Sequence, residues 1–161
     1  MRTGTVVEIH ICPDSGDPME PVTEVEAIEN KGLKGDRYFK EQGIWNLLDQ
    51  NPNREVKEAS AITFIESETI EAIKREAGID LDRGAHRRNV TTDGVPLNHL
   101  VDEEFTVGDV VCRGIMLCEP CGYMQSLSGE NGLSESLVHR GGLNAAVVKS
   151  GKITVNDQIR W

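Results

Sequence analysis

Alternating or clustered hydrophobic residues predict short strands along most of this chain. Residues 4–11 and 22–28 alternate between apolar and polar positions, which is typical of strands with one solvated face. Further strands are predicted where short apolar runs are bounded by turn-forming residues, at residues 58–66, 95–115, 143–148 and 153–161. A succession of many short strands favours a barrel or a closed sheet.

One segment has the pattern of an α-helix. In residues 67–77, Ile70 and Ile73 fall on one face, Ser67 can cap the first turn, and Gly78 can end the helix. This helix carries no residues that suggest chemistry. Two shorter helices are predicted at residues 123–127 and 134–138.

A polar stretch at residues 42–55 predicts a long loop. It contains three asparagines and a proline, with one short turn expected at residues 45–48. Loops of this length inside a domain are often functional lids or mobile segments.

The composition indicates one globular domain, residues 1–161. Hydrophobic residues make up 38 % and charged residues 27 % of the chain, as in folded globular proteins. The formal net charge of −10 disfavours nucleic acid and anionic membranes as partners. No apolar run approaches the roughly 18 residues of a membrane span, and residues 1–5 lack the apolar core of a signal peptide. We therefore expect a cytoplasmic protein.

The chain contains four cysteines, too few for a disulfide scaffold at this length. Cys12 and Cys112 lie in apolar surroundings, so we expect both to pack in the core. Cys118 and Cys121 stand on either side of a Glu-Pro pair, where proline prevents an ordinary central strand from continuing. This pair is the first candidate for chemistry.

Three interpretations of the cysteine pair are open. It could be half of a structural zinc site, completed by Cys112 and His139, but the sequence contains no second close pair of ligands. It could be a thioredoxin-like dithiol, although that motif normally follows a buried strand in a βαβ unit and this region is rich in strands. The third interpretation is one reactive thiol whose neighbour supports it or simply packs beside it.

Three basic segments adjoin glycine turns or strand ends. They are Lys34/Arg37 in a glycine turn, Arg87/Arg88 at the start of a predicted strand, and His139/Arg140 before two glycines. Each can also be interpreted as solvated surface charge. If the fold brings them to the cysteine pair, they would stabilise a thiolate and favour an anionic ligand with a soft-metal or sulfur centre.

Five pieces of the chain match a known family by their order and spacing. They are residues 32–38, 88–92, 118–121, 139–145 and 153–157. With these pieces the chain resembles the MOSC domain, the module at the C-terminus of molybdenum cofactor sulfurases that also occurs as stand-alone bacterial proteins. The resemblance covers nearly the whole chain.

The resemblance implies a mainly β fold (β-rich α+β), a distorted closed β-barrel with a few short helices. It implies molybdenum cofactor (molybdopterin) as the ligand, with Cys121, the cysteine after the proline, carrying sulfur or ligating molybdenum. The basic segments would then bind the pterin phosphate and nearby oxygens, through Lys34, Arg37, Arg88, Asn89, His139 and Arg140.

The chain differs from longer proteins of this kind because it has no cysteine desulfurase domain, so we expect no pyridoxal phosphate. It also has no N-terminal MOSC partner domain and no obvious electron-transfer module. Three functions remain open. They are a cofactor-binding or sulfur-carrying protein that serves cofactor biosynthesis or molybdoenzyme partners, a small molybdenum oxidoreductase that reduces N-hydroxylated compounds with an external electron donor, and a non-catalytic domain that binds another anion.

Overall fold

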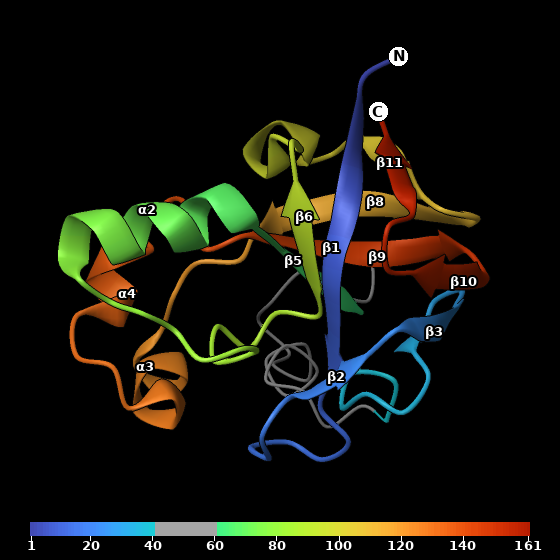
Figure 1. Cartoon of the computed structure of the whole chain (residues 1–161). Helices are drawn as coiled ribbons and strands as arrows, with labels where there is room; N and C mark the ends of the chain where they lie inside the picture. The colour runs from blue at the N-terminus through green and yellow to red at the C-terminus, as the bar shows by residue number, and fades with distance from the viewer. Residues whose placement is uncertain (41–60) are drawn as a thin grey trace, which may run out of the picture.

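Strands dominate the fold (Figure 1). The computed structural model describes residues 1–40 and 61–161, so the loop predicted at 42–55 and the start of the strand predicted at 58–66 lie outside the described residues. The strands are β1 (Thr3–Ile11), β2 (Glu20–Val22), β3 (Glu24–Ile28), β4 (Gly32–Leu33), β5 (Ile62–Glu66), β6 (Val90–Asp93), β7 (Glu104–Val107), β8 (Val110–Leu117), β9 (Leu143–Lys149), β10 (Gly151–Thr154) and β11 (Gln158–Arg160).

Seven of these strands close into a barrel. Their order is β11-β7-β8-β9-β5-β6-β1, and pairing of β1 with β11 closes the ring, with Thr3 opposite Arg160. β2 extends the sheet from β1, while β10, β3 and β4 form a separate small sheet. The mainly β, closed-barrel fold predicted from the sequence is therefore confirmed.

Alternate residues of β9 fill the interior of the barrel. On β9, Leu143, Ala145 and Val147 are fully buried in the main core, as expected from the two-residue period of a strand. Asn144 and Ala146, which point to the other face of β9, are also buried. β9 is thus covered on both faces.

The described α-helices gather on one side of the barrel (Figure 1). A second, smaller core joins them through Ile73, Met124 and Leu133, one from each helix, together with Ile79 and Leu137. None of the described helices has both the length and the apolar character that a membrane crossing requires. The helices are α2 (Ser67–Ala77), α3 (Gly122–Ser128) and α4 (Leu133–Ser136), and a 3₁₀ helix, η1 (Leu97–Leu100), precedes β7.

Several element boundaries differ from the prediction. The strand predicted at residues 22–28 is divided at Thr23 between β2 and β3. Ser67 does not cap α2, because the cap position is Glu66 and no side chain makes a capping hydrogen bond there. The predicted end at Gly78 is confirmed, with φ of 68°. Within the region predicted as strands from residue 95, the first element is η1, a helical turn.

Candidate functional site

A small cavity brings Cys121 together with three buried arginines. Its volume is about 50 Å³, and we call it the thiol cavity. Its walls come from segments that are far apart in the sequence, after β1, after β4, before β6 and between β8 and α3. The lining residues that carry the argument below are Arg37, Tyr38, Arg87, Arg88, Cys118 and Cys121.

The segment between β8 and α3 presents Cys121 to solvent. The backbone N–H of Cys118 donates a 2.7 Å hydrogen bond to the carbonyl of Gly142, and Pro120 then interrupts the pairing because it has no N–H. Cys121 stands in extended conformation before α3, and its carbonyl accepts a 2.9 Å hydrogen bond from the Ser134 hydroxyl. The Cys121 side chain is exposed, whereas Cys118 is only 1 % exposed. Of this pair, Cys121 is the thiol within reach of a ligand.

Arg88 ties this cysteine segment to the start of β9. Its Nε donates to the carbonyl of Gly141 at 2.9 Å, and its Nη2 donates to the carbonyl of Cys118 at 3.0 Å. Gly141 is required at this close approach, because a β-carbon there would collide with the Cys118 carbonyl. The guanidinium is therefore held in one place at the wall of the cavity.

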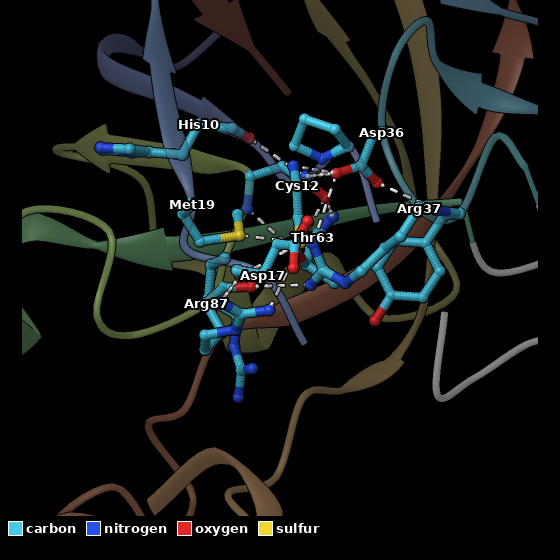
Figure 2. A network of polar contacts seen from close by, with 12 residues as sticks. His10, Cys12, Asp17, Met19, Asp36, Arg37, Thr63 and Arg87 are labelled. Atoms are coloured by element: carbon cyan, nitrogen blue, oxygen red, sulfur yellow. Dashed lines mark hydrogen bonds and ion pairs between the residues drawn. The ribbon is translucent and has the colours of Figure 1, made fainter. Parts of the chain in front are cut away.

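Arg37 and Arg87 also line the cavity, and a hydrogen bond joins them (Figure 2). Arg37 donates to the Arg87 carbonyl at 3.0 Å, and its guanidinium lies 4.6 Å from the centre of the Tyr38 ring. Arg87 donates to the Asp17 carbonyl and, at 3.4 Å, to the sulfur of Cys12. The backbone of Arg87 has φ of 66°, a region that a non-glycine residue seldom adopts and that is concentrated at functional sites.

Asp36 organises the turn that carries Arg37. Its carboxylate is fully buried and accepts hydrogen bonds from the backbone N–H of Cys12 at 2.8 Å and of Tyr38 at 3.1 Å. It also accepts a 3.2 Å bond from the Asn89 amide and forms an ion pair with Arg37 at 3.3 Å. Asp36 thus links β1, the turn after β4 and the segment before β6, and it balances one of the three arginine charges.

The other two arginines are not balanced within the described chain. Arg87 and Arg88 are only 8 % and 7 % exposed, yet no carboxylate of the described residues lies within ion-pair distance of either guanidinium. An isolated buried charge is costly unless a counter-charge compensates it. The walls of the thiol cavity therefore carry an excess of positive charge that suits an anion.

Tyr38 and Glu119 are further ionisable residues of the cavity wall. Burial raises the pKa of Tyr38 above its usual range, which makes its phenol a weaker acid than an exposed tyrosine. The carboxylate of Glu119 faces His139, whose backbone N–H donates to it at 3.0 Å and whose Nδ1 lies 3.1 Å from its other oxygen. Glu119 is therefore held by His139.

The structure places only part of the predicted site set in this cavity. Cys121, Arg37 and Arg88 lie there together. The other four predicted residues have different partners. Lys34 is exposed and pairs with Glu26 at 2.7 Å, Asn89 bridges Thr63, His10 and Asp36 inside the fold, His139 is 82 % exposed, and Arg140 bonds to Ser136 and Glu76.

Sequence reasoning did not include Arg87, Tyr38 or Ser15 in the site set, although all three line the cavity. The sequence could have indicated the first two, because Arg87 is adjacent to Arg88 and Tyr38 follows Arg37 in the glycine turn. No sequence pattern indicates Ser15 as a site residue. The arginine pair also precedes the strand that it was expected to open, since β6 begins at Val90.

Cys12 and Cys112 are both buried as predicted, but only Cys112 has the apolar surroundings that were expected for both. Cys12 is fully buried as predicted, but its surroundings are polar, because its sulfur lies 2.8 Å from the Asp14 carbonyl and contacts Arg87. Cys112 lies in the apolar barrel core, where burial raises its pKa to about 12. Its thiol is therefore inert at neutral pH.

The two alternative interpretations of the cysteine pair gain no support. Among residues 1–40 and 61–161, no group of three or more histidine, cysteine, aspartate or glutamate side chains could hold a metal ion. Cys112, which the zinc interpretation required, lies in the barrel core. The strands on either side of the pair, β8 and β9, are antiparallel neighbours, so they do not form the βαβ unit of a thioredoxin-like motif.

Comparison with known proteins identifies the family. The model of the MOSC domain matches residues 51–160 of the chain. The chain belongs to the MOSC domain family. No functionally curated protein matches its sequence. Membership of the MOSC family indicates a role connected with the molybdenum cofactor.

Solved structures with MOSC-type folds resemble this one over nearly its whole length. YuaD from Bacillus subtilis superimposes with a TM-score of 0.78 at 16 % identity, covering 98 % of this chain and 94 % of that one. YiiM from Geobacillus stearothermophilus gives 0.70 at 16 % identity, covering 98 % and 74 %. YiiM from Escherichia coli gives 0.67 at 15 % identity, covering 99 % and 69 %. At these identities the likeness concerns the fold.

Proposed function

We propose that this MOSC protein binds the molybdenum cofactor in the thiol cavity, or carries sulfur to it, through Cys121. One observation carries the proposal. Two buried arginines without a carboxylate partner in the described chain share a cavity with an exposed thiol. That combination offers positive charge for an anionic group and a soft ligand for molybdenum or sulfur, side by side.

The residues present fit the two chemical ends of the cofactor. Each arginine has five N–H donors, and the contacts of Arg88 with Gly141 and Cys118 use two of them, which leaves donors for a phosphate. Cys121 would ligate the metal or accept sulfur. When bound, the cofactor supplies redox-active molybdenum, while the chain binds and orients it.

In the sulfur-carrying role, Cys121 is the residue that reacts. Its thiolate would attack the outer sulfur of a persulfide donor, the donor's S–S bond would break, and the donor would leave as a thiolate. Cys121 would then hold the transferred sulfur as a persulfide for the cofactor. The arginines that share the cavity with Cys121 would favour the negative charge of its persulfide.

One observation supports the oxidoreductase alternative. Reduction of an N–O bond consumes protons, and the phenolic hydroxyl of Tyr38, a hydrogen-bond donor, stands at the wall of the cavity. In that role Cys121 would be a molybdenum ligand, and Tyr38 would hold a proton near the substrate. An external electron donor would still be required.

Metal and pterin analysis of the purified protein tests the proposal. Protein from a molybdenum-replete host should contain molybdenum and release a fluorescent pterin. Arg88→Met should lose most of both, whereas Lys152→Met, which removes an exposed positive charge from β10, should retain them. Wild-type protein without molybdenum or pterin, and without a sulfur adduct after incubation with a persulfide donor, would contradict it.

Intact-mass measurement and turnover separate the two roles. Sulfur transfer should add one sulfur to the wild-type mass, and Cys121→Ser should abolish that gain. An unchanged gain in Cys121→Ser would remove Cys121 as the carrier. Reduction of a hydroxylamine by the loaded protein with a supplied electron donor would favour the oxidoreductase role.

A further inference from the structure

A second cavity adjoins the thiol cavity, and Arg87 lines both. The second cavity has a volume of about 260 Å³, and we call it the Met19 cavity. Its wall includes Pro18, Met19, Arg87 and Leu127, and the exposed Asp82 and Arg83 stand at its rim. Met19 also reaches the thiol cavity's wall, because its sulfur accepts a 3.4 Å hydrogen bond from Arg37. The two cavities therefore share a boundary made of Arg87 and the Met19–Arg37 contact (Figure 2 shows these side chains together).

Three apolar side chains of the Met19 cavity suit a planar ring. Leu127 of α3 is 39 % exposed, which is high for a large apolar side chain and leaves its surface available for contact. Pro18 is apolar, and the thioether of Met19 makes favourable contacts with aromatic rings. A guanidinium such as that of Arg87 also stacks on planar rings.

Arg87 is equipped to hold an anion at the boundary. Its contacts with the Asp17 carbonyl and the Cys12 sulfur fix the guanidinium but use two of its five N–H donors. No carboxylate of the described residues lies within ion-pair distance of its guanidinium, although that of Asp82 lines the same cavity. Its strained backbone, with φ of 66°, is maintained by the surrounding contacts and gives the side chain its direction.

We infer that the Met19 cavity is a second binding subsite, which takes the planar ring of an organic phosphate whose phosphate group lies at Arg87. The inference rests on the proposed function, because that assigns an anion to the arginines of the thiol cavity. It adds that the ligand extends past Arg87 into a second cavity. The thiol cavity, at about 50 Å³, is far smaller than the pockets that enclose whole organic ligands.

The test compares two probes that share the same anion. Inorganic phosphate addresses the arginines alone, whereas adenosine 5′-monophosphate adds a planar base. Dissociation constants are measured with the full chain by isothermal titration calorimetry. We expect adenosine 5′-monophosphate to bind at least about tenfold more tightly than phosphate, as one additional buried ring contact would give.

Matched variants assign the gain to the Met19 cavity. Leu127→Ala should remove most of the tenfold gain and leave the phosphate affinity unchanged, because Leu127 contributes an apolar surface and no charge. Val138→Ala is the control, since Val138 is similarly exposed and lines neither cavity. It should change neither affinity. Thermal denaturation of both variants confirms that they are folded.

The outcomes distinguish this inference from the proposed function. Phosphate binding without a gain for adenosine 5′-monophosphate, or equal losses in Leu127→Ala and Val138→Ala, overturns the second subsite and leaves the anion site in place. If neither probe binds the wild-type chain, the anion site itself is overturned and the second subsite with it.

Discussion

Arg88 holds the cysteine segment between β8 and α3 through a 3.0 Å hydrogen bond from its Nη2 to the carbonyl oxygen of Cys118. Its Nε makes a second bond, to Gly141, so the planar guanidinium fork joins the cysteine segment to β9. A lysine keeps the charge but cannot reproduce the fork. The first prediction follows from this difference.

Arg88→Lys should lower the free energy of unfolding by about 1–3 kcal/mol, the range for lost hydrogen bonds to a charged donor. Urea denaturation followed by circular dichroism measures the change. Arg160→Lys is the matched control, because the Arg160 side chain is exposed at the end of β11 and its guanidinium bonds to the side chain of Gln158. Equal losses in both variants would show that Arg88 has no special role in holding the segment.

The different exposure of the cysteines predicts selective alkylation. Cys12, Cys112 and Cys118 are buried in the native protein, and Cys121 is exposed. Brief treatment with iodoacetamide at neutral pH should therefore add one adduct, and Cys121→Ser should add none. After unfolding in urea, the wild-type chain should accept four. Rapid native labelling of a second cysteine, found by intact-mass spectrometry, would contradict the arrangement of the thiol cavity.

The buried imidazole of His86 predicts a loss of stability in acid. Burial, with smaller effects from Arg88 and His10, lowers the pKa of His86 from 6.5 to about 3. The unfolded chain therefore binds a proton more readily than the folded chain as the pH falls from 6.5 towards 3. This single residue should reduce the free energy of unfolding by up to about 1.4 kcal/mol per pH unit in that interval, and it should contribute no pH dependence above it.

His86→Asn tests this linkage because an asparagine oxygen can replace Nδ1 as the acceptor for the backbone N–H of Arg88, a 3.0 Å bond in the native protein. The variant should lose stability less steeply between pH 6.5 and 4, as measured by urea denaturation at each pH. His99→Asn, at an exposed position of η1, is the control and should keep the wild-type steepness. If His86→Asn loses stability with falling pH as steeply as the wild type does, His86 is not the source of the acid sensitivity.

Two glycines with positive φ should differ sharply in their tolerance of alanine. Gly142 has φ of 108°, and a β-carbon there would collide with the carbonyl of Phe64 on β5. Gly129 has φ of 72°, with no atom within 4 Å of the added carbon. We expect Gly129→Ala to cost about 1–2 kcal/mol from backbone strain alone, and Gly142→Ala about 3 kcal/mol or more. Thermal denaturation compares them, and similar costs would show that the close approach at Gly142 can relax.

The strands and the main helix could be predicted because their signals are local. The two-residue alternation marked β1 and the three- to four-residue spacing of Ile70 and Ile73 marked α2. The boundaries were less predictable. The division between β2 and β3 depends on their different partners, because β2 pairs with β1 and β3 with β10. Nothing within residues 20–28 specifies those partners.

The site was only partly predictable, because spacing does not determine where a side chain points. Lys34 and Arg37 are three residues apart in one turn, yet Lys34 pairs with Glu26 at the surface and Arg37 lies against Tyr38 in the cavity. His139 is adjacent to Arg140 but turns towards Glu119, through a backbone with φ of 62°. Cys121 could be found because proline and glycine around it leave a recognisable pattern.

The pairing of β1 with β11 has a consequence for synthesis. The seam joins residues at opposite ends of the described chain, with Thr3 opposite Arg160. During translation, β1 emerges from the ribosome first and its partner last, so the ring cannot close until nearly every other strand has been made. Once β7 has been made, one edge of β1 and one edge of β7 carry unpaired backbone groups that can join another chain until β11 pairs with both. This protein should therefore depend on chaperones most strongly just before β11 emerges.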